Sequence, residues 1–187
     1  MLMDTTICEM LSQACRCCKL SSGCCMEARP PLTKSRADIL LAYGVSPSDI
    51  EFQGYRRLRL KPDGFCILLR DGKCTVHSIK PETCVAGPFT FDVKGSILQI
   101  FLKKPSICPM VEVLKQNEEL YQNLFDLSVS KIMDLVSELP AEELAEIVKI
   151  EEPDTDLVAE IKIAKRAIGH ANQTIRLDQS NSLQIEL

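Results

Sequence analysis

Tryptophan is absent from this sequence, and histidine occurs only twice. No apolar run reaches the roughly 18–20 residues that a bilayer-spanning helix needs, so we expect no transmembrane segment. The first residues lack a basic stretch followed by an apolar one, which argues against a secretory signal and for the cytoplasm. A formal net charge of −4 at pH 7 argues against a dedicated nucleic-acid binder.

The composition otherwise fits a globular chain that can bury a core. Of its 187 residues, 45% are hydrophobic and 26% are charged, values close to the average for folded domains. The length predicts one compact domain, with room for a helical extension.

Cysteine is the exception to this ordinary composition. Ten cysteines lie before residue 109 and none follows it: Cys8, Cys15, Cys17, Cys18, Cys24, Cys25, Cys66, Cys74, Cys84 and Cys108. Disulfide scaffolds belong mostly to small secreted chains, so clustered thiols in a reducing compartment indicate metal ligands. A hyperthermophilic source, where intracellular disulfides are common, leaves disulfides as the alternative.

Charge divides at the same place as cysteine. Residues 1–108 carry 15 Lys or Arg against 10 Asp or Glu, whereas residues 109–187 carry 7 against 16. A basic environment lowers thiol pKa values and so stabilises metal-bound thiolates. Arg57, Arg59 and Lys61 alternate along one predicted strand, and we interpret them as a solvated face or as counter-charge to the acidic half rather than as a phosphate site.

Periodicity in the cysteine-bearing half predicts short helices and strands. Helices are expected over 4–15, from Thr33 or Ser35 to Gly44, and from Ser46 onward. Strands are expected over 55–61, 65–70, 73–77, 89–93 and 97–102, with a tight turn at Asp71-Gly72. Cys66 and Cys74 would then lie on paired strands near one hairpin.

Periodicity after Pro109 changes to helical spacing, which predicts helices over 109–139, 140–148 and 153–169. We therefore expect an α+β protein with three parts. A small irregular cysteine-cluster module with short antiparallel strands around a metal site spans 1–109. A helical extension packs on it over 110–169, and its acidic helices could bind a protein partner. A polar tail follows over 170–187.

The spacing of the thiols carries the chemistry. Cys15 and Cys18 form a C-x2-C pair, which lets two sulfur atoms face one ion, and Cys24 and Cys25 follow after a short turn. The later cysteines would have to return to this loop in space. Structural zinc and iron–sulfur clusters each take four such ligands. Eight candidate thiols therefore serve either two sites of four or one site with additional structural thiols.

The order of these residues resembles a known family. The C-x2-C pair, the Cys24-Cys25 pair and the run Gly64-Phe-Cys66, Cys74-Thr-Val-His77, Pro81-x2-Cys84 and Pro88-Phe89 are similar to those of the YkgJ-like cysteine-cluster proteins. The resemblance spans about residues 15–109 and implies chelation of zinc or iron. It implies the ligands Cys15, Cys18, Cys24, Cys25, Cys66, Cys74, Cys84 and Cys108.

The sequence also departs from the family pattern. The gap between Cys18 and Cys24 is longer than usual, so either Cys15 or Cys17 could pair with Cys18. His77 stands where the family commonly has tyrosine, and it is either packed or a ligand. Lys80 and Val85 replace arginines, so no anion-binding role is carried over to them. Distant relatives resemble a methylase, but no Gly-rich methyl-donor fingerprint is found here.

These observations favour an intracellular protein that holds zinc or an iron–sulfur cluster, with a structural or binding role. The alternative is a metal-dependent enzyme or redox protein, such as a protein-modifying enzyme, that uses the same cysteines. No general base stands out beside them, and all-thiolate ligation suits both zinc and iron.

Overall fold

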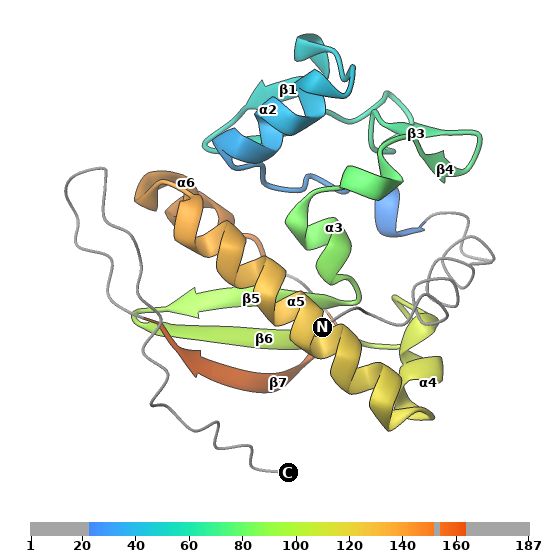
Figure 1. Ribbon diagram of the computed structural model, residues 1–187, viewed down its shortest axis with the longest axis vertical. Coiled ribbons are helices and arrows are strands. Elements are labelled where there is room, and N and C mark those ends of the chain that lie inside the picture. The colour runs from blue at the N-terminus through green and yellow to red at the C-terminus, as the bar shows by residue number, and fades with distance from the viewer. Residues whose placement is uncertain (1–22, 152–153, 164–187) are drawn as a thin grey trace.

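A computed structural model describes residues 23–151 and 154–163 (Figure 1). The predicted helix over 4–15, the predicted polar tail and four cysteines (Cys8, Cys15, Cys17 and Cys18) lie outside the described residues. The chain combines helices with short antiparallel strands, so the prediction of a mixed α+β protein is confirmed. Among the described residues, no helix combines the length and the apolar character that crossing a bilayer requires.

The first unit, residues 23–86, consists of short elements. They are η1 (Gly23–Cys25), α2 (Lys34–Ala42), η2 (Pro47–Asp49), β1 (Ile50–Phe52), β2 (Arg56–Leu58), β3 (Leu69–Arg70), β4 (Lys73–Cys74), η3 (His77–Ile79) and α3 (Glu82–Ala86). Helix α2 begins where predicted, because the Thr33 side chain accepts a hydrogen bond from the Arg36 backbone N–H at 3.0 Å. It ends before Gly44, whose φ of 101° is accessible to glycine.

A small core holds these short elements together. The buried residues of this core all precede η3 in the sequence. They are Leu32, Leu40, Val45, Leu58, Cys66, Leu68 and Val76. Cys25 and Cys74 are half-buried and pack against it. Two of the predicted ligands therefore lie at the edge of this core, and a third lies inside it.

The second unit, residues 89–151 and 154–163, is more regular. It contains β5 (Phe89–Lys94), β6 (Ile97–Lys103), α4 (Met110–Lys115), α5 (Glu118–Glu138), α6 (Ala141–Ile147) and β7 (Thr155–Lys162). The strands form one antiparallel sheet in the order β5-β6-β7. Helix α5 runs obliquely across one face of this sheet (Figure 1). The core between them contains residues from both sides of position 109, including Phe89 and Ile100 before it and Leu124 and Ile132 after it.

The prediction of a helix over 153–169 is wrong where the structure describes this range: Thr155–Lys162 form strand β7. Leu157, Ala159 and Ile161 alternate along the chain and therefore also fit a strand. Pairing with β6 satisfies backbone groups that would otherwise be left open at the edge of the sheet. Tertiary pairing has thus overridden a helical pattern.

The strands of the first unit are shorter than predicted. The 55–61 segment forms a strand only over Arg56–Leu58, and the returning strand of the hairpin ends at Cys74. There the Thr75 backbone and hydroxyl both donate to the Leu68 carbonyl oxygen at 3.0 Å, which turns the chain out of the strand. His77, predicted to lie on this strand, is instead exposed at the start of η3.

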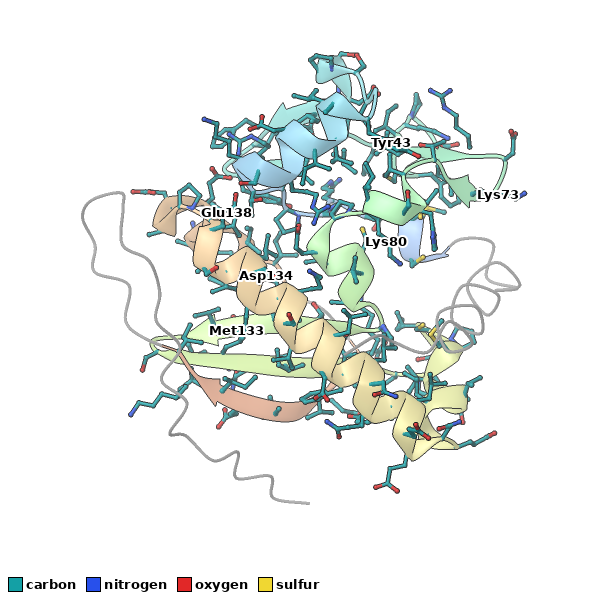
Figure 2. The ribbon with its side chains drawn as sticks, viewed as in Figure 1. Tyr43, Lys73, Lys80, Met133, Asp134 and Glu138 are labelled. Carbon is teal, nitrogen blue, oxygen red and sulfur yellow. The ribbon has the colours of Figure 1, made fainter. Side chains whose placement is uncertain are left out.

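The two units are joined by α3 and by carboxylates of α5 and α6. The buried Ser128 hydroxyl on α5 donates to the Ala86 carbonyl oxygen of α3 at 2.9 Å. Glu138, at the end of α5 that faces α2 (Figure 2), accepts a hydrogen bond from the Ser35 N–H at 3.0 Å. Glu143 on α6 accepts one from the Arg56 N–H at 2.9 Å. Part of the acidic charge of the second half is therefore used to contact the first unit.

Candidate metal centre

The early and late cysteines meet through a short backbone ladder. The Cys66 N–H donates to the Cys25 carbonyl oxygen at 2.8 Å, and the Glu27 N–H donates to the Gly64 carbonyl oxygen at 2.8 Å. On its other side, the segment around Cys66 pairs with Leu60. The residues around Cys66 therefore form the middle of a three-segment ladder, which brings the loop carrying Cys24 and Cys25 against the hairpin.

Cys74 reaches the same place through the β3–β4 hairpin. The Leu69 N–H donates to the Cys66 carbonyl oxygen at 3.0 Å, and Leu69 is the register partner of Cys74. This tight geometry explains why Cys25, Cys66 and Cys74 contact the same small core. The prediction that Cys66 and Cys74 lie on paired strands holds for Cys74 but not for Cys66, because β3 comprises only Leu69–Arg70 and Cys66 lies just before it.

Cys84 approaches from α3. Besides burial, which is the larger cause, ionisation of Cys66, Cys74 or Cys24 would raise the pKa of Cys84, so these thiols lie near it. We call Cys24, Cys25, Cys66, Cys74 and Cys84 the thiol cluster; all five are free thiols. Figure 2 shows sulfur atoms where η1, β4 and α3 come together, beside Lys80.

The electrostatics of Cys24 favour a thiolate. A hydrogen bond between the side chains of Cys25 and Cys24, supported by the charges of Lys80 and Lys103, lowers the pKa of Cys24 to about 6, although burial opposes this shift. Lys80 could have been suspected from the sequence, because it lies only four residues before Cys84. Lys103 is at the end of β6, and only the packing of the two units brings it near Cys24.

Cys25, Cys66 and Cys84 resist ionisation. The hydrogen bond to Cys24, burial and the neighbouring cysteines raise the pKa of Cys25. Burial is the main cause that raises the pKa of Cys66, and it raises the pKa of Cys84 to about 12. Neighbouring thiolates in a partly dry site repel one another, and a bound cation removes this penalty. The soft sulfur donors and their mutual repulsion therefore fit a thiophilic metal such as zinc or iron.

One predicted ligand that the structure describes packs elsewhere than at the thiol cluster. Cys108 precedes α4 and packs against the core of the second unit. Cys15 and Cys18 lie outside the described residues, and within residues 23–151 and 154–163 no three His, Cys, Asp or Glu side chains already stand in a metal-holding arrangement. The complete set of eight ligands, and ligation by His77, therefore remain predictions.

The basic side chains Arg57, Arg59 and Lys61 contact acceptor groups within the first unit. Arg57 Nε donates to Glu51 Oε1 at 2.9 Å, and Arg59 lies 3.7 Å from the other carboxylate oxygen. The Lys61 ammonium donates to the Leu69 carbonyl oxygen, next to the turn that carries Cys66. These contacts provide local counter-charge and leave the phosphate interpretation without support.

Comparison with known proteins agrees with this chemistry. Neither the curated proteins nor the solved structures contain a match to the chain. A family model named CxxCxxCC and described as "Putative zinc- or iron-chelating domain" matches residues 14–120. This match covers more than half of the chain and includes every residue of the thiol cluster. The resemblance seen in the cysteine pattern is thereby confirmed, and the chain belongs to the CxxCxxCC family.

Proposed function

We propose that this protein binds zinc or iron through its clustered cysteine thiolates and that the metal stabilises the first unit. The observation that carries the proposal is the ladder between Cys25 and Cys66, which joins two cysteine groups far apart in the sequence. The first unit has few regular elements and a small core. In small modules of this kind, the free energy of metal binding is largely free energy of folding.

The proposed ligands are the thiol cluster together with Cys15, Cys18 and Cys108. They would serve either one site or two, and they could hold single zinc or iron ions or an iron–sulfur cluster. The five free thiols of the cluster support a reducing compartment such as the cytoplasm.

The metal is identified by anaerobic purification of the full chain, followed by metal and sulfide analysis and an absorption spectrum. A colourless protein with stoichiometric zinc indicates a thiolate zinc site, and a brown protein with iron and sulfide indicates a cluster. Protein that contains no metal and takes up neither zinc nor iron would overturn the proposal.

Replacing Cys74 or Cys84 by Ser tests the ligands. Each variant should lose bound metal and thermal stability together, because an incomplete site leaves the first unit unsupported. Cys8→Ser is the matched control, since Cys8 falls outside the family pattern, and it should keep its metal. Full metal content in both Cys74→Ser and Cys84→Ser would show that these two thiols are not ligands.

A further inference from the structure

One arginine in the first turn of α2 holds the chain segment that leads to Cys84. Arg36 Nε donates to Glu82 Oε1 at 2.7 Å, and its Nη2 lies 2.5 Å from the same oxygen. Arg36 Nη1 donates to the Ile79 carbonyl oxygen at 3.2 Å. The guanidinium thus contacts both ends of the segment from Ile79 to Glu82, three positions apart in the sequence.

The start of α3 has no side-chain cap, although its far end packs on α5. Helix α3 has only five residues, and its N-cap is Pro81, which makes no side-chain capping hydrogen bond. A helix start without a cap leaves backbone N–H groups without partners and frays readily. Arg36 is itself well fixed, because its own N–H is capped by Thr33 and the neighbouring Ser35 N–H donates to Glu138.

Burying the Arg36–Glu82 ion pair costs hydration energy that an apolar contact at the same place would not cost. The Arg36 side chain is 17% exposed and that of Glu82 is 7% exposed. Among the described residues, Glu82 Oε2 is buried without a hydrogen-bond partner. Burying charges costs hydration energy that attraction offsets only when the remaining polar atoms are also satisfied. Replacing a buried ion pair by apolar residues of similar volume is often neutral or stabilising, which points to a role for this pair in placing the segment.

The segment that Arg36 holds carries two groups of the site. Lys80 lies between the two anchored residues, and its charge acts on both Cys24 and Cys84. Cys84 follows Glu82 by two residues, within the same short helix. A shift at the start of α3 would therefore move a proposed ligand and the cation beside it together.

We propose that Arg36 is a positioning residue for the metal centre: by holding Ile79 and Glu82 it fixes the start of α3 and so sets Cys84 and Lys80 against the thiols of η1 and β4. This inference rests on the proposed function. Arginine suits the role because its planar, forked group reaches several acceptors at once, whereas lysine places a single ammonium.

The test uses the full chain refilled with Co²⁺, whose absorption in thiolate sites reports ligand number and geometry. Arg36→Lys, Arg36→Met and Glu82→Gln are compared with the wild type by Co²⁺ titration and by the spectrum at saturation. Arg57→Met is the matched control, because Arg57 forms an ion pair with Glu51 in the same unit and its other side-chain partners, Gln53 and Tyr55, lie outside α3. Circular dichroism checks that each variant is folded.

We expect the Arg36 and Glu82 variants to bind Co²⁺ about 10–100-fold more weakly, the usual effect of losing an outer-shell partner, and to show altered ligand-field bands. The control should keep the wild-type spectrum. If Arg36→Lys and Glu82→Gln bind Co²⁺ as the wild type does, the positioning role of Arg36 is overturned while the proposed metal binding stands. These two milder variants decide the test if Arg36→Met does not fold. Failure of the wild type to bind Co²⁺, zinc or iron would instead overturn the proposed function.

Discussion

At the scale of single residues, the thiols of one cluster differ in acidity. Cys24 is exposed and has a pKa of about 6, whereas the half-buried Cys84 has a pKa of about 12. Only the thiolate is nucleophilic, so the metal-free protein at neutral pH should be alkylated at Cys24 well before Cys84. Peptide mapping after brief iodoacetamide treatment across a pH series would show the Cys24 rate rising through about pH 6. Equal labelling of the two sites would contradict these environments.

The causes of this acidity can be separated. The hydrogen bond with Cys25 is its largest cause and Lys80 a smaller one, so Cys25→Ala should move the Cys24 profile to higher pH more than Lys80→Gln does. Loss of a donor or of a cation disfavours the thiolate, so both shifts have the same sign.

At the scale of elements, the two faces of the second-unit sheet differ in their contribution to stability. Leu98 on β6 is completely buried, whereas Leu157 on the neighbouring β7 is 50% exposed. Leu98→Ala should lower the free energy of unfolding by about 2–5 kcal/mol because it leaves a cavity. Leu157→Ala should change it by less than about 0.5 kcal/mol, as surface substitutions usually do. Urea unfolding of the two variants measures the difference, and equal losses would show that something covers the outer face.

Several elements could be predicted from the sequence because their signals are local. The cap at Thr33, the strands β5 and β6 with their turn, and the apolar stripe of α5 all follow from neighbouring residues. For β7 the local pattern fits both a helix and a strand, and its pairing with β6, which decides between them, depends on residues about 60 positions away.

The site shows the same division between local and distant signals. The choice of cysteines followed from their spacing, but the ladder between Cys25 and Cys66 and the approach of Lys103 depend on how distant segments pack. The helix that carries Cys84 has five residues and no side-chain cap, so it left no periodic pattern to recognise.

At the scale of the whole molecule, acid should weaken the junction between the units. Burial alone would raise the pKa of Glu138, but hydrogen bonds from Ser35 and Thr33 and the charge of Arg36 lower it below its ordinary value of 4.5. A carboxylate with a lowered pKa stabilises the folded state above its unfolded pKa, and this contribution is lost as the pH falls through the folded pKa. The melting temperatures of the wild type and Glu138→Gln should therefore differ at pH 7 and converge below about pH 4.5. A gap that persists in acid would show that the carboxylate charge is not involved.

Strand β7 also sets an order of events during synthesis. The segments that carry the thiol cluster leave the ribosome first, and they complete their ladder from residues 24–84 alone. Strand β6 follows, but its second edge stays open until Thr155–Lys162 emerge. An open strand edge is a template for pairing between chains. A nascent or shortened chain that stops before Thr155 thus carries its thiol cluster while the open edge of β6 can still pair with another chain.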